Sequence, residues 1–255
     1  MFPTPSDPLA VLADEPASAA ALDAARTEVD TLLWRRDVRS AAAEVAAASV
    51  ERGARDSAAI DGADVVVVDD SPMGRVLGAS LRLTAEVPRQ VDIFATAPLQ
   101  ALARLHALVA HDFAAPDELG RPRSGEAADD PLQLGALPPA AVSADRLAAL
   151  AGILTSTTTA PALLLAAVTH AELAVLRPFT WGSGLLARAS VRLVMAARGV
   201  DPSLFSIPER GMLELGRPAY VKALRAYASG SPAGVSDFIV WHCTAVAMGA
   251  RAVSV

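Results

Sequence analysis

The sequence predicts an all-α protein, and three observations support that prediction. Apolar residues recur at intervals of three, four and seven over most of the chain, which is the spacing of one face of a helix. Alanine, the best helix former, supplies much of the 53% hydrophobic content. Prolines stand near the beginning of apolar segments and glycines after their ends, as they do at helix boundaries. With 255 residues and no repeat period, the chain fits one large domain, alone or with an N-terminal helical extension.

The N-terminal part divides into two regions. Residues 1–16 are rich in proline and are expected to be loose. Residues 17–70 form a helical region, which begins with a helix over 17–52. Gly53 is a candidate break, after which the helix can resume as far as Gly62. In the segment DVVVVDDSPMG that follows, the valines favour extended backbone and the Asp-Asp-Ser-Pro is a turn and helix-start signal. We therefore expect a short extended connection there.

The remaining residues, 71–250, form the predicted helical core. Its helices are expected at residues 73–87, 97–112, 144–156, 161–176, 183–199, 208–229 and 232–250. Local signals set the boundaries, because Ser143 is a plausible N-cap, Pro161 suits a first turn and Gly199 is a typical terminator. One long segment, 116–139, is dense in Gly, Pro and Asp. Such a loop is typical of a functional flap or a disordered segment, and we expect a small β-hairpin within it.

Composition excludes several classes of function. The net charge of −6 argues against a nucleic-acid surface. Cys243 is the only cysteine, so an internal disulfide and a thiolate zinc site are excluded, and a reducing cytoplasm fits. The N-terminus lacks the basic start and long apolar run of a secretory signal. The most apolar window, TTAPALLLAAVTHAELAVL, is interrupted by Pro161, His170 and Glu172, so it predicts a buried core helix rather than a membrane span. We expect a cytoplasmic protein that binds neither nucleic acid nor membrane.

The stretch LRPFTWGSGLLAR, residues 176–188, contains the strongest candidate for a binding site. Gly182, Ser183 and Gly184 stand immediately before a predicted helix, whose free N–H groups and positive dipole end favour an anion. Arg188, about one turn into that helix, is placed to add a bidentate phosphate contact. The alternative interpretation is that the two glycines only make a tight turn between helices.

This stretch resembles the signature of the Fic (Fido) domain family, His-Pro-Phe-x-Asp/Glu-Gly-Asn-Gly-Arg-x-x-Arg. The positions that keep the family residue are Pro178, Phe179, Gly182, Gly184 and Arg188. The preceding helix, with a histidine at position 170, resembles the family's lead-in, and LHALVAHDF…ELGRPR resembles its helix and Gly-x-x-Arg loop. The resemblance implies a helical Fido core over 71–250, with 116–139 as the flap that binds a target protein.

A second motif, DSAAIDG at residues 56–62, resembles the inhibitory helix of the same family, Ser-Ser-x-Ile-Glu-Gly. Ser57 and Gly62 match, and Asp61 stands in place of the glutamate. In such proteins that glutamate pairs with the second motif arginine, so the resemblance implies an ion pair between Asp61 and Arg188. Aspartate is one methylene shorter, which predicts a looser contact or a shifted helix.

The departures from the signature fall on the residues that carry the chemistry. The general-base histidine is replaced by Arg177, and a guanidinium stays protonated and has no acceptor lone pair. Trp181 replaces the acid that would hold magnesium, and an indole cannot ligate a hard cation. Ser183 replaces asparagine, which is a mild change. Leu185 replaces the first arginine, and one lost charge-assisted contact costs roughly 1.5–3 kcal/mol of binding.

No other residue offers a clear substitute for the missing base. His170 lies two turns before the motif, about 10 Å away along the helix axis, which is too far for direct proton transfer. His106 and His111 are five apart on a helix and make a poor metal pair. His242 and Cys243 belong to an apolar helix. We interpret the histidines as satisfied core or surface residues, and expect no metal site.

Phe179 and two pairs of acidic residues receive structural interpretations. The ring of Phe179 is expected to be buried below the turn, where it fixes the angle of the loop. The acidic pairs Asp69–Asp70 and Asp129–Asp130 are interpreted as solvated loop charges rather than acid and base dyads.

These observations lead to a primary hypothesis and two alternatives. The primary one is a catalytically degenerate Fido protein that acts as a binding or regulatory module, with a weak phosphate or nucleotide pocket at Gly182, Ser183, Gly184 and Arg188. ATP binding is expected to be weak and magnesium is not expected; the partner is an unidentified protein, and a homodimer stays open. The first alternative is a Fic-type adenylyltransferase, moving AMP from ATP to a protein hydroxyl, with a non-standard base. The second is a ligand-binding protein whose Trp181 stacks on a flat ligand.

Overall fold

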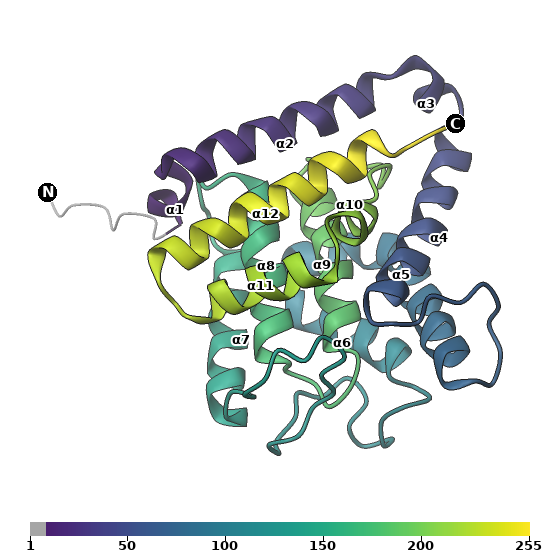
Figure 1. Cartoon of the computed structure of the whole chain (residues 1–255), viewed down its shortest axis with the longest axis vertical. Coiled ribbons are helices and arrows are strands. Elements are labelled where there is room, and N and C mark those ends of the chain that lie inside the picture. Colours follow the sequence, from purple (N-terminus) through teal and green to yellow (C-terminus); the bar gives the residue numbers. More distant parts are fainter. Residues whose placement is uncertain (1–8) are drawn as a thin grey trace, which may run out of the picture.

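Two helices with few polar residues form the centre of the protein. In α8 (Ala162–Leu176) every residue after the first is buried, and α9 (Ser183–Ala197) buries all its residues except Gly184 and Ala197. A helix that is apolar on every side must be covered on every side. The short connection at residues 177–182 makes the two helices neighbours, and the other helices surround them (Figure 1).

The computed structural model describes residues 9–255, and the described residues form helices without any strand. The all-α class that the sequence predicts is therefore confirmed. The other helices, in chain order, are α1 (Ala10–Asp14), α2 (Pro16–Trp34), α3 (Arg36–Ser40), α4 (Ala42–Ile60), α5 (Pro72–Thr96), α6 (Pro98–Val109), α7 (Ala140–Thr155), α10 (Pro208–Leu215), α11 (Arg217–Ala228) and α12 (Pro232–Arg251).

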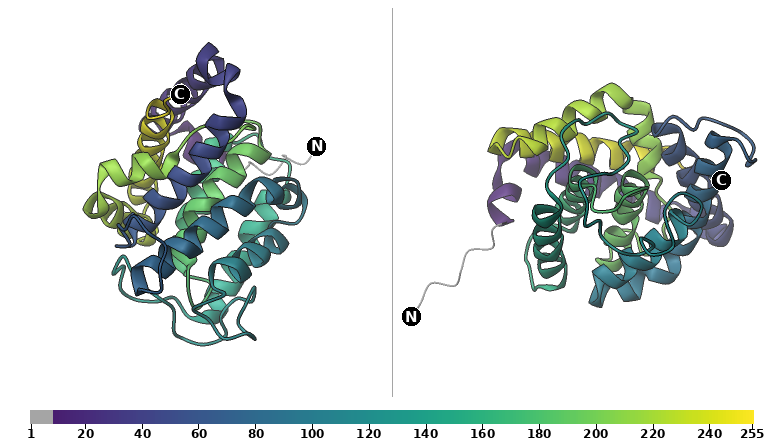
Figure 2. Two further views of the ribbon diagram at one scale, coloured as in Figure 1. Left: turned by 90° about the vertical axis from the view of Figure 1, so that its right-hand side faces the viewer. Right: turned by 90° about the horizontal axis from the view of Figure 1, so that it is seen from below.

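The surrounding helices form two groups. The helices α2 and α12 lie side by side and cover α8, with α10 and α11 beside α12, whereas α5, α6 and α4 pack on the side of α9 (Figures 1 and 2). By length and composition α12 could cross a membrane, but 56% of its apolar window is buried inside the protein. Its contacts with α2, α8, α10 and α11 account for its apolar character.

The N-terminal region differs in detail from the expectation. Residues 1–8 lie outside the described residues, and the part of the expected loose segment that is described folds, since Leu9 is buried and α1 follows it. The helix expected over 17–52 is broken at Arg35 and Ala41, where the backbone leaves helical geometry. Gly53 does not interrupt α4. Its missing side chain admits the guanidinium of Arg192, which a Cβ at this position would overlap.

Two more boundaries depart from the expectation for local reasons. The helix expected over 73–87 continues to Thr96, because Pro88 removes only one hydrogen-bond donor from α5. The helix expected over 208–229 is two helices, which meet at Gly216 with φ 88°, a conformation that favours glycine.

The β-hairpin expected in residues 116–139 is wrong. This segment, called the flap from here on, contains no paired strand. Its backbone bonds run to the loop between α8 and α9 instead, since the N–H of Arg123 donates to the carbonyl of Pro178 and the N–H of Asp129 to that of Thr180, at 2.8 and 2.9 Å. Besides local turns such as the one closed by the N–H of Gln133 and the carbonyl of Asp130, the flap therefore folds onto that loop.

We predict that a methyl group at Gly211 destabilises the fold, because a Cβ there would overlap the backbone carbonyl of Ala245 where α10 crosses α12. For Gly211→Ala we expect a loss of about 1–3 kcal/mol in the free energy of unfolding, measured by urea denaturation. Gly152→Ala in α7 is the control. A Cβ at Gly152 meets nothing within 4 Å, so that variant should gain about 0.4–1 kcal/mol. Equal effects of the two substitutions would contradict the close crossing.

Candidate functional site

The loop between α8 and α9, residues 177–182, begins and ends in left-handed backbone. Arg177 follows the last residue of α8 with φ 44° and ψ 63°, and Gly182 precedes α9 with φ 78°. Glycine adopts this conformation freely, whereas arginine does so only where surrounding contacts hold it. The loop, called the motif loop below, thus depends on the contacts that fix Arg177.

Phe179 anchors the middle of the motif loop, as expected. Its ring is buried and stacks on His106 of α6 with centroids 4.0 Å apart. Ser183 closes the turn, because its hydroxyl accepts from the N–H of Phe179 at 3.2 Å and lies 3.3 Å from the Phe179 carbonyl. The substitution of asparagine by serine therefore leaves a hydroxyl that holds the loop.

His106 joins the motif loop to the flap, a role that the sequence did not indicate. Its Nδ1 accepts from the N–H of Gly120 at 2.9 Å, so its proton is on Nε2, which donates to the carbonyl of Trp181 at 3.2 Å. Burial lowers the pKa of His106 to about 4, so the ring is neutral at physiological pH. A neutral ring can make one accepting and one donating contact at once.

Arg123 ties the base of the flap to the end of α8. Its buried guanidinium donates to the carbonyls of Arg177 at 2.8 Å and Leu176 at 3.3 Å, which are left without helical partners at the C-terminus of α8. It also donates to the carbonyls of Gly125, two residues further along the flap, and of Pro138, near the flap's C-terminal end. A cation at this position also complements the negative end of the helix dipole.

Arg177, at the position of the family's base, is a buried cation that holds the flap. Its side chain is only 6% exposed and pairs with Asp130 at 2.9 Å. It also donates to the carbonyls of Gly135 and Ala136, each at 2.8 Å. A guanidinium in this setting donates hydrogen bonds and accepts no proton.

Asp129 and Asp130 are not the solvated charges that the sequence predicted. Asp129 accepts from the N–H of Gly182 at 3.2 Å, and Asp130 accepts from the N–H groups of Leu134 and Gly135 besides pairing with Arg177. The expectation failed because the pairing partners lie some fifty residues away along the chain and only the fold brings them together. Both carboxylates belong to the candidate site.

The electrostatics around Asp129 favour its protonated form. The pKa of Asp129 is raised to about 7, chiefly by burial, and the neighbouring carboxylates of Asp61 and Asp130 contribute to the rise. The hydrogen bond from Gly182 and the charge of Arg177 act in the opposite direction. Since a carboxyl pKa is usually about 4, this group changes charge in a range where an ordinary aspartate does not.

The ion pair implied for Asp61 and Arg188 is present. The carboxylate of Asp61 lies 2.6 Å from Nη2 of Arg188, and Ser57 accepts from the same guanidinium through its hydroxyl at 2.7 Å and its carbonyl at 3.1 Å. Arg188 is fully buried. Gly62, with φ 96°, ends α4 just after Asp61 and sets the carboxylate at the start of α9.

Three buried polar atoms at the start of α9 have no hydrogen-bond partner among the described residues: Oδ1 of Asp61, Oδ1 of Asp129 and Nη1 of Arg188. A Cβ at Gly184 would lie 3.5 Å from that nitrogen and 3.7 Å from Oδ1 of Asp61, so two of the three gather at this glycine. The N–H groups of residues 183–185 also lack helical acceptors. This end of α9 has donors for an anion, and the protein's own carboxylates already occupy part of it.

Trp181 and Leu185 complete the departures from the family pattern. The Trp181 indole stacks on Phe113 with centroids 3.8 Å apart and planes 2° apart, so one of its faces is already covered. Leu185 is buried in the core. The described residues contain no group of three His, Cys, Asp or Glu side chains suited to a metal ion. The residues at this loop therefore do not fit the magnesium that the family resemblance implies.

The other histidines and the cysteine considered from the sequence are core residues, with the exception of His111. His170 is buried, with Nε2 2.5 Å from the hydroxyl of Tyr220 and Nδ1 3.1 Å from Nδ1 of His242. Burial lowers the pKa of both histidines, to about 3 for His242, and raises the pKa of Cys243 to about 12. His111 is exposed beside Asp112.

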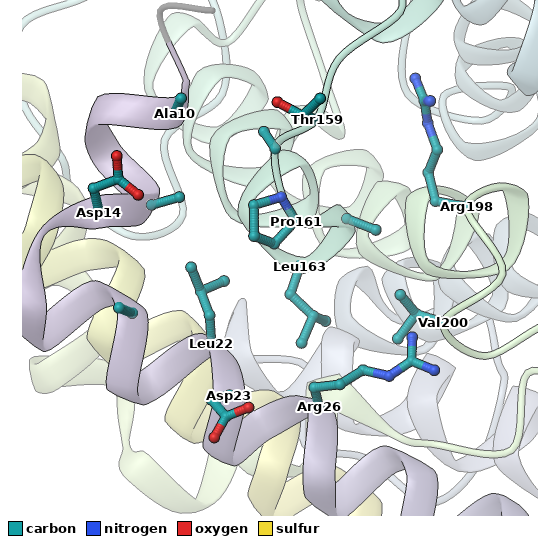
Figure 3. Close-up of a pocket in the computed structure, with 14 residues that line it drawn as sticks. Ala10, Asp14, Leu22, Asp23, Arg26, Thr159, Pro161, Leu163, Arg198 and Val200 are labelled. Carbon is teal, nitrogen blue, oxygen red and sulfur yellow. The ribbon is translucent and has the colours of Figure 1, made fainter.

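A separate cavity of about 570 Å³ lies between α1, α2, the beginning of α8 and the end of α9 (Figure 3). Leu22 and Leu163 contribute to its apolar wall, and the side chains of Arg26 and Arg198 lie beside it. It is at the opposite end of α8 from the motif loop, and a helix of this length spans roughly 22 Å. The cavity is therefore not part of the candidate site.

Comparison with known proteins supports the fold and goes no further. No family model matches the sequence, and no curated protein matches it. Among solved structures, a Fic family protein from Desulfovibrio desulfuricans G20 is similar over 92% of this chain and 73% of its own, with 19% identity and a TM-score of 0.73. A fragment of Fic-1 from C. elegans is similar over 96% of this chain and 73% of its own, with 16% identity and a TM-score of 0.61. The chain thus has the Fic (Fido) fold that its motifs indicated.

We predict that the Asp61–Arg188 pair is strongly coupled. Removing one partner of a buried pair leaves an uncompensated charge, so Arg188→Ala should lower the free energy of unfolding by about 3–5 kcal/mol in urea denaturation. A double-mutant cycle with Asp61→Asn should give a coupling of about 0.5–3 kcal/mol. Glu51→Gln, which cuts the exposed pair with Arg55, is the control and should change stability by less than about 1 kcal/mol. Additive effects of Arg188→Ala and Asp61→Asn would contradict the prediction.

Proposed function

We propose that this chain is a Fido-fold protein without Fic transfer chemistry, which acts as a binding or regulatory module through an anion site at the start of α9. The observation that carries the proposal is Arg177. Where the family pattern has a base, this chain has a buried guanidinium paired with Asp130. Such a group cannot take a proton from a target hydroxyl.

The state of the phosphate cradle supports weak binding. The first motif arginine is replaced by buried Leu185, and the second, Arg188, is already paired with Asp61. One charge-assisted hydrogen bond contributes roughly 1.5–3 kcal/mol to binding, so its loss lowers the affinity for phosphate by about ten- to a hundredfold. An entering phosphate also has to displace a carboxylate from Arg188. The ligand we propose is a small phosphate-bearing or other oxyanion group, with ATP as a weak case.

Magnesium has no part in the proposed function. Trp181 offers no oxygen, Asp61 is engaged with Arg188, and Asp129 accepts from Gly182. Octahedral coordination by oxygen ligands, which magnesium requires, has no basis in these residues. We propose further that the partner is a protein rather than a nucleic acid or a membrane, that the chain works in the cytoplasm, and that a homodimer is one candidate assembly.

One observation favours the adenylyltransferase alternative. Asp129 of the flap contacts the motif loop at Gly182, and its pKa of about 7 is near the value that suits a general base at neutral pH. Against this role, one of its oxygens accepts from the N–H of Gly182, and the loss of both a metal ligand and an arginine leaves a transferred phosphoryl group poorly stabilised. A variant at Asp129 therefore helps to distinguish a binding module from an adenylyltransferase.

We predict no transfer of AMP. Purified protein is incubated with lysate and α-labelled ATP, and protein labelling is compared for wild type, Asp61→Gly and Gly184→Val. Asp61→Gly frees Arg188, and Gly184→Val fills the space at the start of α9, where a Cβ already lies 3.5 Å from Nη1 of Arg188 and from Oδ2 of Asp61. We expect no labelling above background in any of them.

Two outcomes would overturn this prediction. Labelling that Gly184→Val abolishes would establish a transferase, and its further loss in Asp129→Asn would identify the base. The second readout is calorimetric titration with ATP, with and without magnesium. We expect weak binding that magnesium does not strengthen, and clear magnesium-dependent binding would contradict the proposed function.

A further inference from the structure

The flap reaches the motif loop with two carboxylates and does so at both ends of the loop. Asp130 pairs with Arg177 where the loop leaves α8, and Asp129 accepts from Gly182 where the loop enters α9. Between them, the backbone of Asp129 donates to the carbonyl of Thr180. From the far side, Arg217 and Arg225 of α11 donate to flap carbonyls. The flap is therefore closed over the motif loop by contacts at its tip as well as at its base.

The carboxyl group of Asp129, which is largely protonated below about pH 7, stands where an anion would bind. The positive end of the α9 dipole and the free N–H groups of its first turn attract negative charge, and Gly182 already donates to Asp129. Asp61 neutralises Arg188 from the other side. Nη2 of Arg188 and the N–H of Gly182 thus meet acidic groups of this chain, Asp61 at the end of α4 and Asp129 of the flap, whereas Nη1 of Arg188 has no partner among the described residues.

We propose that Asp129 and Asp130 make the flap an acidic plug, which closes the anion site at the start of α9 and is released when an anion binds there. The proposal rests on the proposed function for the nature of the ligand, but the closure itself does not depend on it. Arg177 gains a role in this arrangement. It anchors the plug through Asp130 while the flap is closed, and its cation faces the site when the flap leaves.

The charged groups around Asp129 give the plug a defined response to pH. Asp61 faces it from the end of α4, Asp130 from the flap and Arg177 from the motif loop. His106 of α6 bonds to the carbonyl of Trp181, the residue before Gly182. Its pKa is lowered to about 4, so it is neutral above that pH. Asp129 is therefore the group that changes charge here between pH 5 and 8.

The direction of the response follows from linkage. Closure raises the pKa of Asp129 to about 7, whereas a released, solvated carboxyl has its ordinary value of about 4. The closed state therefore binds an extra proton between these two values. Closure is most favourable at low pH, weakens as the pH rises towards 7, and changes no further above it.

An experiment without ligand tests the plug by measuring hydrogen exchange at the backbone amides of residues 129 and 182. The exchange rate of each amide is converted to a protection factor, and the amide of Leu186 in α9 is the internal reference. In the wild type we expect protection to fall at least about tenfold between pH 5 and 7 and then to level off. In Asp129→Asn, which keeps an acceptor but cannot ionise, it should stay constant. Asp117→Asn, an exposed position on the same flap, removes the same charge and should behave like the wild type. Constant protection in the wild type would overturn the plug.

A second experiment tests release by the anion. The probe is inorganic sulfate, whose charge is constant from pH 5 to 8, titrated calorimetrically at fixed ionic strength. If the plug leaves, wild-type affinity should rise about tenfold between pH 5 and 7, and Asp129→Asn should show no such rise. An affinity that falls with pH would mean that Asp129 stays beside the anion, which contradicts release. If no variant binds sulfate but the pH-dependent hydrogen exchange is observed, the anion function is overturned, whereas the pH-dependent closure of the flap is upheld.

Discussion

Two buried helix ends meet at the motif loop, and the rest of the site depends on how their charges are balanced. The C-terminus of α8 leaves carbonyls without partners, and the N-terminus of α9 leaves N–H groups. The flap supplies a group of the right sign to each, because the guanidinium of Arg123 donates to the carbonyls of α8 and the carboxylate of Asp129 accepts from Gly182. A flap that made only hairpin contacts with itself would leave both ends unsatisfied in a buried environment. The irregular course of residues 116–139 follows from this requirement.

The placement of Arg177 and the closure of the flap are parts of one arrangement. Arg177 holds left-handed backbone that arginine rarely adopts, and its ion pair with Asp130 and its bonds to two flap carbonyls keep it there. A histidine at this position would have neither the reach nor the charge to make these contacts. The residue that stands at the position of the family's base therefore fastens the flap. On the other side of α9, Asp61 occupies Arg188 in the same way. The site is closed by acids from two directions, and both would have to move before an anion could enter.

The sequence indicated the frame of this site better than its closure. Helical spacing located most of the helices, and the matched spacing of two motifs placed Asp61 beside Arg188, because a shared fold fixes such a pair even at low identity. The sequence did not predict the helix breaks at Arg35 and Gly216, because the apolar spacing continues through them and tertiary packing decides where a helix ends. Asp129 was misjudged for a different reason. An acidic pair in a polar loop looks solvated unless the loop's partner is known, and its partner Gly182 is distant in the sequence.

The most direct test of the account is the protonation of Asp129, since that carboxyl reports whether the flap covers the start of α9. It can be followed by ¹³C NMR titration of the side-chain carboxyl, assigned by comparison with Asp129→Asn. A closed flap predicts a midpoint of about 7, well above the ordinary aspartate value of about 4. A midpoint near the ordinary value of about 4 would show that the carboxyl is solvated, and it would contradict a closed flap on the motif loop.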